Sequence, residues 1–366
     1  MTKRSISLVV GARPNFMKIA PIVRALDKVS SDFTYRLIHT GQHNSSEMND
    51  VFFSELGIPE PDIYLNGRGG THAEQTARIM IDFEADCVNY KPDIVLVVGD
   101  VNSTLACSIV SKKLCIRLVH VEAGLRSGDH EMPEEINRIV TDSITDLFFV
   151  TEPAGVDNLL REGHDKAIIH YVGNVMIDNL SYQVKKLNKI DSSTFITNKL
   201  KNTLGNYGVL TLHRPSNVDN LEKLSQLIKA INKISIKLPI IFPVHPRTKQ
   251  NLEKFNIEFS SNIFLIPSLP YMEFLNIWRD AQVVLTDSGG LQEETTALGV
   301  PCITLRENTE RPITVEKGTN RVVGTKYSNI IENVDDVLAQ SFHKKNIPKY
   351  WDGEASERII KVLLEN

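Results

Sequence analysis

The segment IRLVHVEAGLRSGDHEMPEEINR, residues 116–138, joins an apolar run to a dense group of charges. Its first six residues have the β-branched composition of a buried strand, and the acids after Pro133 are typical of a helix N-terminus. A strand that leads into a helix is the repeating unit of parallel α/β sheets, in which ligands bind at the carboxyl ends of the strands. Because the charges follow the strand directly, we expect them to line a ligand site.

The same alternation of short apolar runs and amphipathic stretches continues along the chain and predicts parallel sheets with helices between the strands. The strands expected in the first half are SISLVV, TYRLIHT, DIVLVV, IRLVHV and DLFFVT. Those expected in the second half are YGVLTL, PIIFPV, NIFLIP, QVVLTD, PCITL and RVVG. A polar stretch from about residue 181 to residue 206 separates the two series. We therefore expect an α/β protein with two doubly wound domains that face each other across a cleft.

The composition is that of a globular protein large enough for two hydrophobic cores. The chain has 366 residues, 42% of them hydrophobic, and a net charge of −4. This balance predicts no nucleic-acid partner and no attraction to an anionic membrane. No apolar stretch approaches the ~20 residues that a membrane span needs. A cytoplasmic protein with reduced thiols is expected, because no CxxC or zinc-site spacing relates the four cysteines, Cys87, Cys107, Cys115 and Cys302.

Chemically active side chains follow nearly every expected strand. The residues directly after the strands are Gly11-Ala12-Arg13, Gly41-Gln42-His43, Gly99-Asp100, Glu122, His213-Arg214, His245, Asp287-Ser288-Gly289-Gly290 and Arg306. Because the carboxyl ends of parallel strands meet at one edge of a sheet, we expect these side chains to line a site. No HxH or HxxxH pair occurs, so the histidines do not predict a metal centre.

The segment TDSGGLQEE, residues 286–294, predicts an anion site. A strand ends in Asp287, Ser288 can begin the next helix, and the two glycines let backbone N–H groups approach a ligand closely. Such a cradle suits a diphosphate, and Glu294, one turn into the helix, can accept hydrogen bonds from ribose hydroxyls. No GxGxxG or GxxxxGK[ST] motif competes with it. The alternative is an ordinary capped helix with a glycine turn.

Two further strand ends carry basic residues. GARPNFMK, residues 11–18, offers Arg13 and Lys18 after the first strand, and ENTERP, residues 307–312, offers Arg311. Arginine forks suit phosphate oxygens. Together with the glycine cradle, these residues predict that the protein binds a nucleoside diphosphate.

Blocks spread from residue 5 to about residue 325 resemble, in order, those of the non-hydrolysing UDP-N-acetylglucosamine 2-epimerases. The blocks are GARPNFMKIAPIVRAL, HTGQH, VVGDVNSTLA, HVEAGLRS, MPEEINR, VGNVMID, LTLHRPSN, FPVHPRT, DSGGLQEE and RENTERP. The resemblance implies a glycosyltransferase-B-like architecture. Its expected parts are an N-terminal Rossmann-like domain over 1–176, a UDP-binding Rossmann-like domain over 177–350, and a C-terminal helix, 351–366, packed back on the first domain.

The resemblance also implies an activity and partners. The expected reaction is reversible conversion of UDP-GlcNAc into UDP-ManNAc, with no nicotinamide or metal as cofactor, for bacterial cell-surface polysaccharide synthesis. Family members are often homodimers, and many bind a second UDP-GlcNAc that acts as an allosteric activator. The positions implied for this second site are Gln42, His43 and Arg68.

The family's motifs assign the remaining roles residue by residue. The implied catalytic residues are Asp100, Glu122, Glu134 and His213. The implied substrate-binding residues are Arg13, Lys18, Arg138, His245, Ser288, Gly289, Gly290, Glu294 and Arg311.

The chemistry of the implied reaction explains why it needs such a set. The hydrogen on carbon 2 of the sugar is not acidic, but loss of UDP from carbon 1 acidifies it, and elimination then gives 2-acetamidoglucal. Return of UDP with a proton delivered to the opposite face inverts carbon 2. This route needs two proton-transfer groups and cationic partners for the departing diphosphate.

Four alternatives stay open from the sequence. The substrate can be a UDP-2,3-diacetamido-glucuronate, or the enzyme can be a hydrolysing epimerase that releases N-acetylmannosamine and UDP. A glycosyltransferase of the same fold would need an acceptor site. A sugar-nucleotide sensor without activity would need the phosphate clamp but not three carboxylates.

Overall fold

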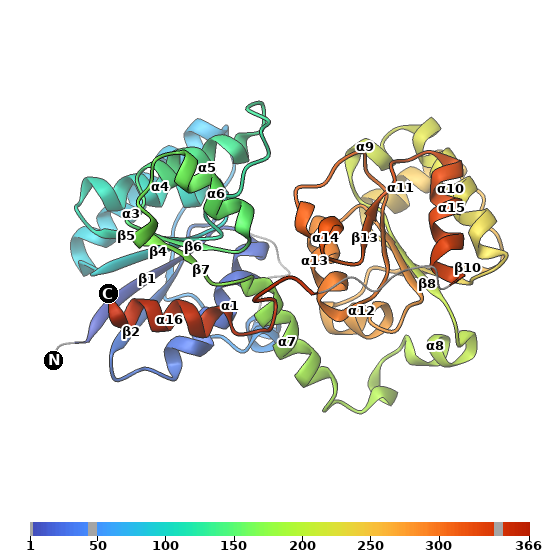
Figure 1. The fold of residues 1–366 in the computed structure, drawn as a ribbon, viewed down its shortest axis with the longest axis horizontal. Coiled ribbons are helices and arrows are strands. Elements are labelled where there is room, and N and C mark those ends of the chain that lie inside the picture. Colours follow the sequence, from blue (N-terminus) through green and yellow to red (C-terminus); the bar gives the residue numbers. More distant parts are fainter. Residues whose placement is uncertain (1–2, 43–49, 340–346) are drawn as a thin grey trace. The chain divides into compact units, whose positions relative to one another are not determined.

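The computed structural model describes residues 3–42, 50–339 and 347–366. The chain divides into two compact units, each built on a parallel sheet with helices against it (Figure 1). Unit 1 comprises Met1–Ser181 and Lys349–Asn366, and unit 2 comprises Tyr182–Pro348. The expected α/β fold class with two Rossmann-like, doubly wound domains is therefore confirmed.

Within the described residues, the sheet of unit 1 has seven parallel strands in the order β3-β2-β1-β4-β5-β6-β7. The strands are β1 (Arg4–Val10), β2 (Phe33–His39), β3 (Ile63–Tyr64), β4 (Ile94–Val98), β5 (Arg117–Val121), β6 (Leu147–Val150) and β7 (Ile169–Tyr171). The helices are α1 (Arg13–Asp27), α2 (Asp50–Leu56), α3 (His72–Tyr90), α4 (Asn102–Lys113), α5 (Pro133–Ser143), α6 (Pro153–Arg161), the 3-10 helix η1 (Lys166–Ile168), α7 (Val175–Leu187) and α16 (Ala355–Glu365). Helix α7 continues into unit 2.

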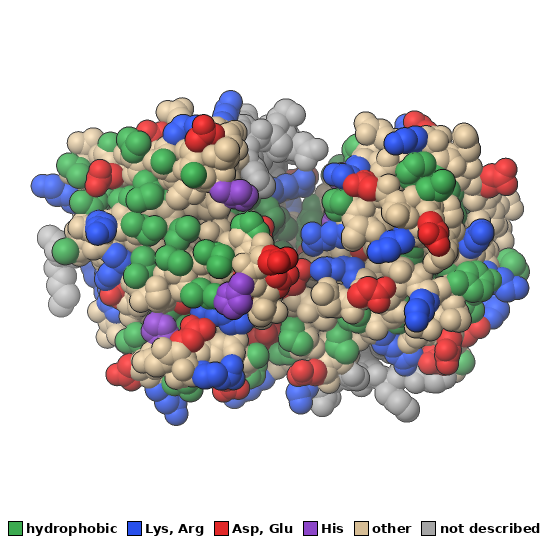
Figure 2. All heavy atoms as spheres, turned by 90° about the horizontal axis from the view of Figure 1, so that it is seen from above, with side chains coloured by type: hydrophobic (Ala, Val, Ile, Leu, Met, Phe, Trp, Pro, Cys, Tyr) green, Lys and Arg blue, Asp and Glu red, His purple; other side chains and the backbone are tan. Residues whose placement is uncertain are grey.

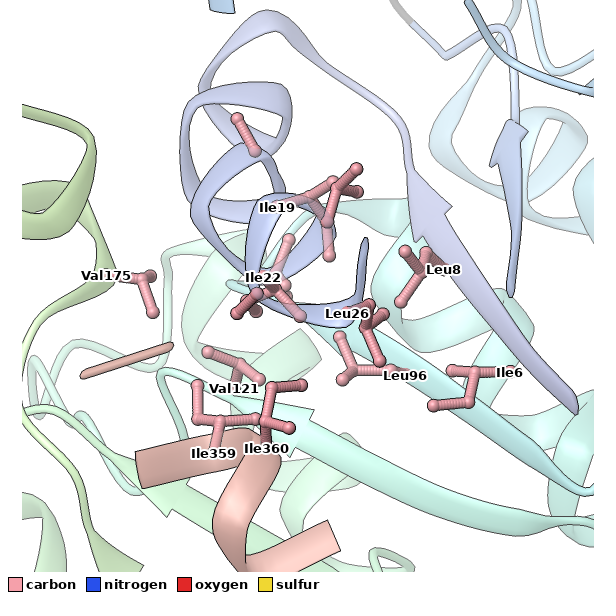
Figure 3. Packing of buried hydrophobic residues seen from close by; sticks show 14 of the residues in the cluster. Ile6, Leu8, Ile19, Ile22, Leu26, Leu96, Val121, Val175, Ile359 and Ile360 are labelled. Carbon is pink, nitrogen blue, oxygen red and sulfur yellow. The ribbon is translucent and has the colours of Figure 1, made fainter. Parts of the chain in front are cut away.

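The strands of unit 1 bury both faces, as a doubly wound sheet requires. Leu8 and Val10 of β1 point to the face covered by α1 and α16, whereas Val9 between them packs with α3 and α4 on the other face. Figure 3 shows Ile359 and Ile360 of α16 beside the residues of α1 and the sheet. Each such fully buried aliphatic side chain contributes about 1.5–3 kcal/mol, so the last helix of the chain is an integral part of this core.

Within the described part of unit 2, six parallel strands form a sheet in the order β10-β9-β8-β11-β12-β13. The strands are β8 (Gly208–Thr211), β9 (Ile240–Val244), β10 (Ile263–Pro267), β11 (Val283–Thr286), β12 (Cys302–Thr304) and β13 (Asn320–Val322). The helices are η2 (Ser192–Thr194), α8 (Asn198–Leu204), α9 (Pro215–Val218), α10 (Leu221–Ser235), α11 (Pro246–Lys254), α12 (Tyr271–Trp278), α13 (Gly289–Leu298), α14 (Pro312–Glu316) and α15 (Tyr327–Leu338).

Both strand orders reverse direction once, and the reversal marks where a ligand is expected. The reversal falls between β1 and β4 in unit 1 and between β8 and β11 in unit 2. At such a switch point the adjacent loops leave toward opposite faces of the sheet and open a crevice at the strand ends.

No helix among the residues that the structure describes combines the length and apolarity needed to cross a bilayer.

Candidate functional site

Proline residues set where the helices begin after several strands. Pro14, Pro133, Pro215, Pro246 and Pro312 each occupy one of the first helical positions. Proline disfavours helical backbone in the preceding residue and tolerates the first turn itself. The residues before Pro215, Pro246 and Pro312 are N-cap residues with non-helical backbone, and they are Arg214, His245 and Arg311. Arg13, before Pro14, is already the first residue of α1.

An ion pair lies at the switch point of unit 1. The Nζ of Lys18, in α1, contacts a carboxylate oxygen of Glu122, and both residues are less than a tenth exposed. Glu122 has φ = +72°, a left-handed backbone that is uncommon for a residue with a side chain. Such conformations cost about 1–3 kcal/mol and concentrate at functional sites. The backbone N–H groups of Glu122 and Ala123 hold the turn in place by donating to the carbonyl oxygen of Phe149, at 3.0 and 3.2 Å.

Arg138 forms two further ion pairs next to that of Lys18 and Glu122. One Nη of Arg138, in α5, is 2.5 Å from the carboxylate of Asp100, and the other is 2.8 Å from that of Glu135. Although burial opposes the shift, these two partners and the nearby Glu122 raise the pKa of Arg138. The three ion pairs thus form one charge cluster, which brings Lys18, Asp100, Glu122 and Arg138 together.

Two adjacent acids at the start of α5 have opposite surroundings. Glu134 is exposed in the first turn of α5. Glu135 is 1% exposed, and its carboxylate accepts from the backbone N–H groups of Ser127 and Gly128 at 2.9–3.0 Å as well as from Arg138. Glu135 therefore holds the loop after β5 against α5, a contact that the sequence motifs do not predict.

In unit 2, a buried carboxylate holds a histidine at the switch point. Asp287, after β11, is 0% exposed, and its Oδ1 lies 3.0 Å from the Nδ1 of His213, after β8. Burial opposes ionisation, but the ring contact with His213 and the backbone N–H groups of His213 and Arg214 lower the pKa of Asp287. An ionised partner fixes the proton on Nδ1, so that Nε2 is presented away from Asp287. The side chain of His213 is 36% exposed, which leaves it accessible to a ligand.

The predicted cradle begins α13, with Ser288 as its N-cap residue. A Cβ placed on Gly289 would meet only Glu310 Oε2, at 3.8 Å, and one on Gly290 would meet nothing within 4 Å. Neither glycine has a positive φ. Neither protein packing nor backbone conformation therefore requires glycine here, which favours the interpretation that space is kept for a ligand at the helix N-terminus.

Three arginines gather beside the cradle. Arg306 Nη2 is 2.9 Å from Glu310 Oε1, and Arg311 Nε is 3.1 Å from Glu293 Oε1. Although burial opposes the shift, Arg306, Arg311 and Arg214 lower the pKa of Glu310. Of these three arginines, only Arg311 is among the substrate-binding residues expected from the family motifs. Arg214 and Arg306 could have been found from their positions just after β8 and β12.

The remaining predicted residues have the following surroundings. Glu294 is 7% exposed and accepts from Tyr271 Oη at 2.7 Å. The exposed ring of His245 lies 5.9 Å from that of His213. Arg13 is exposed in the first turn of α1, Gln42 accepts from Ser103 N and Oγ, and the exposed Arg68 accepts through its carbonyl oxygen from Arg78. His43 lies outside the described residues.

Replacing Gly289 with valine is expected to weaken UDP binding about 10- to 100-fold. The added side chain blocks access to backbone N–H groups, and hydrogen bonds to a charged group contribute about 1.5–3 kcal/mol. The melting temperature should stay unchanged, because the space around Gly289 is open. Isothermal titration calorimetry with UDP measures the effect, and unchanged affinity in a folded variant contradicts the cradle.

The affinity for UDP is expected to rise with pH across neutrality. Burial raises the pKa of Glu294 to about 7, although the hydrogen bond from Tyr271 opposes the shift. The carboxylate that would accept ribose hydroxyls is thus mostly protonated at pH 6 and mostly ionised at pH 8. Because only protein with an ionised Glu294 is competent to accept these hydrogen bonds, the dissociation constant of UDP should be about tenfold larger at pH 6 than at pH 8.

The matched control for this pH dependence is Glu294→Gln. The phosphate of UDP also titrates, with a pKa near about 6, and this contribution is common to both proteins. Calorimetry from pH 6 to 8 should give a flatter profile for the variant. Identical profiles for the two proteins would remove Glu294 from the ribose site.

Two successive Rossmann-like units, each with polar residues at its own switch point, place the chain in the class of two-domain α/β proteins with the glycosyltransferase-B-like fold. The model of the UDP-N-acetylglucosamine 2-epimerase family matches residues 24–364. The chain belongs to this family and is an isomerase, as the sequence motifs indicated.

Individual relatives match over their full length. The UDP-N-acetylglucosamine 2-epimerase of Methanocaldococcus jannaschii is 43% identical over 365 residues, which cover 98% of each chain. The crystal structure of the Methanocaldococcus jannaschii UDP-GlcNAc 2-epimerase in complex with UDP-GlcNAc and UDP gives a TM-score of 0.84, at 41% identity, and covers 99% of this chain and 100% of that one. The UDP-2,3-diacetamido-2,3-dideoxy-D-glucuronate 2-epimerase of Pseudomonas aeruginosa is 36% identical over 366 residues, covering 98% of this chain and 99% of that one.

Proposed function

We propose that the protein interconverts UDP-GlcNAc and UDP-ManNAc by inverting carbon 2. The observation that carries this proposal is the buried charge cluster in unit 1, in which Asp100 and Glu122 come from the ends of two neighbouring strands and each has its own cation. The cradle of unit 2 adds a place for the diphosphate. The relative crystallised with UDP-GlcNAc and UDP supports the substrate. The product would supply N-acetylmannosamine units for cell-surface polysaccharides.

In the proposed mechanism the substrate eliminates UDP and later takes it back. The bond between carbon 1 and the diphosphate oxygen breaks, its electron pair leaves with UDP, and a carboxylate removes the proton from carbon 2. Neutral 2-acetamidoglucal remains. In the reverse step a proton is delivered to the other face of carbon 2 and UDP adds to carbon 1.

The charge cluster suits the proton transfers of this mechanism. Lys18 and Arg138 are paired with Glu122 and Asp100, so each carboxylate proposed for proton transfer has a cation beside it. Glu134, exposed in the first turn of α5, is proposed as the third acid of the set. His213, Arg311 and the N-terminus of α13 are proposed to stabilise the departing diphosphate.

Incubation with UDP-GlcNAc alone in D₂O, followed by NMR, tests the proposal. The expected products are UDP-GlcNAc and UDP-ManNAc at equilibrium, both with deuterium at carbon 2. Free N-acetylmannosamine with UDP would identify a hydrolysing enzyme instead. Product that keeps its original hydrogen at carbon 2 would contradict the elimination.

A second substrate class is favoured by one relative. The 36% identical protein of Pseudomonas aeruginosa is named as an epimerase of a UDP-2,3-diacetamido-glucuronate. A parallel incubation with this sugar nucleotide compares the two substrates directly. A higher kcat/KM for the glucuronate would replace UDP-GlcNAc as the proposed substrate.

We also propose that the protein is a homodimer joined through α3 and α5. Ile81 and Val88 of α3 are 67% and 53% exposed, and Ile136 of α5 is 42% exposed. A hollow of about 530 Å³ lies between these helices and α4. Figure 2 looks onto unit 1 from above and shows many hydrophobic side chains, in green, on this side. An apolar surface of this kind marks a protein contact.

Replacing Ile81 with glutamate should shift the protein toward monomers in sedimentation velocity experiments, because a buried unpaired charge opposes association. The matched control is Ile236→Glu, which changes an equally exposed isoleucine in unit 2.

A second UDP-GlcNAc, bound at Gln42 and Arg68, is proposed as an allosteric activator. Measuring the rate of the reverse reaction with and without added UDP-GlcNAc tests this proposal.

A further inference from the structure

A buried histidine lies beneath the turns that carry Asp100 and Glu122, and the mechanism above gives it no role. His120, in β5, is 0% exposed. Its Nδ1 lies 2.7 Å from Asp142 Oδ1, and its Nε2 lies 2.8 Å from the carbonyl oxygen of Gly99. Asp142, in α5, is also 0% exposed. Both ring nitrogens thus have a partner inside the protein.

The two partners determine the charge of the ring. A backbone carbonyl oxygen accepts hydrogen bonds and cannot donate them. Asp142 is an acceptor as well, because its carboxylate pairs with Arg126 and accepts from the backbone N–H of Gly124. A neutral imidazole has one N–H and can satisfy one acceptor, so two acceptors at hydrogen-bond distance require both nitrogens to carry a proton. This arrangement of two acceptors is the one that an imidazolium satisfies.

The charged groups around the ring balance this cation. Asp142 Oδ2 lies 2.8 Å from Arg126 Nη1 and accepts from the backbone N–H of Gly124 at 3.0 Å. The Asp142 carboxylate therefore lies between two cations, one on each oxygen. Arg126 also pairs with Glu162, at 2.7 Å, so each of the two cations has a carboxylate beside it.

The bond to Gly99 fixes the turn after β4. Gly99 has φ = +68°, which glycine adopts without strain, and its N–H donates to the carbonyl oxygen of Val121 at 3.1 Å. Its carbonyl oxygen points to His120, so both polar groups of Gly99 are held by β5. In a trans peptide the next N–H, that of Asp100, points to the opposite side. The position of Asp100 is therefore tied to the strand that also carries Glu122.

We infer that His120 is a positioning residue, which as a buried cation between Asp142 and the Gly99 carbonyl sets the spacing of Asp100 and Glu122. This inference rests on the proposed function, because it concerns the two acids proposed for proton transfer. It adds a group that does not touch the substrate and acts through the turn. A shift of about 1 Å in a reacting group can cost about 10²-fold in rate, so the spacing matters.

Two substitutions remove the two hydrogen bonds of His120 one at a time. His120→Asn places an amide nitrogen near the Nδ1 position and keeps the contact with Asp142, but it releases Gly99. His120→Gln places one near the Nε2 position and keeps the contact with Gly99. We expect His120→Asn to lower kcat by about 10²-fold and His120→Gln by clearly less, with UDP affinity unchanged in both. The matched control is His170→Gln in β7, a histidine of the same sheet, which should leave kcat unchanged.

Neutron diffraction from crystals of the unaltered protein at pH 8 measures the charge directly. Deuterium on both ring nitrogens of His120 is expected, and deuterium on one nitrogen overturns the inference. So does a kcat of His120→Asn within threefold of the unaltered protein. A different result, full activity of Asp100→Asn, would contradict the proposed function. That result would not change what neutron diffraction shows for His120.

Discussion

Glutamine in place of Glu122 is expected to lower turnover by about 10²–10⁴-fold, the range typical of a lost acid or base. The substitution keeps the size of the side chain but removes both its charge and its partner role for Lys18. The affinity for UDP should stay within about twofold, because the cradle is built from residues of unit 2. Steady-state kinetics with UDP-GlcNAc and calorimetry with UDP measure the two quantities separately.

The control for this variant is Asp146→Asn. Asp146 is also an ion-paired carboxylate of unit 1, 2.6 Å from Lys112, but it lies before β6, away from the carboxyl ends of the strands. Its replacement removes a comparable charge without touching the cluster, and turnover should persist. If Glu122→Gln keeps near-normal turnover, or if it loses UDP binding together with turnover, Glu122 has no part in proton transfer.

Asparagine in place of His213 is the second substitution with a large expected effect, again about 10²–10⁴-fold in turnover. The amide nitrogen of asparagine can replace Nδ1 in the contact with Asp287, so the loop after β8 keeps its anchor. What is lost is Nε2, the atom that is proposed to face the diphosphate. The measurement is the rate at which deuterium from D₂O appears at carbon 2, since this rate reports the elimination itself.

Asp287→Asn tests the orientation of the His213 ring separately from the presence of that ring. It keeps the shape of the side chain but removes the charge that fixes the proton of His213, so we expect a loss between the unaltered protein and His213→Asn. Deuterium exchange in His213→Asn at the normal rate would show that the histidine does not assist the departure of UDP.

The sequence predicts the second sheet completely and the first sheet in part. Each strand of unit 2 overlaps one of the expected runs, and the three-residue strands β12 and β13 overlap PCITL and RVVG. The strands β3 and β7, at the two edges of the other sheet, have two and three residues and no counterpart among the expected strands. The sequence pattern does not mark these two edge segments as strands, and their pairing with β2 and β6 defines them instead.

The candidate site shows the same limit at the level of single residues. Motifs place Asp100, Glu122 and His213, because each directly follows a strand. They do not show that Glu135 faces inward and Glu134 outward, since adjacent helical residues differ by about 100° and only the packed helix defines the buried side. The role of His120 depends on Gly99 and Asp142, which lie 21 and 22 residues away along the chain.

The C-terminal helix has a consequence for the order in which the protein is completed during synthesis. α16 supplies Ile359, Ile360 and Leu363 to the core of unit 1, and Asp178 accepts from the backbone N–H groups of Ala355 and Ser356. The ribosome releases these residues only after all of unit 2. The unit translated first therefore keeps an open apolar face on α1 until α16 has been made, whereas unit 2 can close earlier. A nascent chain stalled before residue 349 carries this unfinished core.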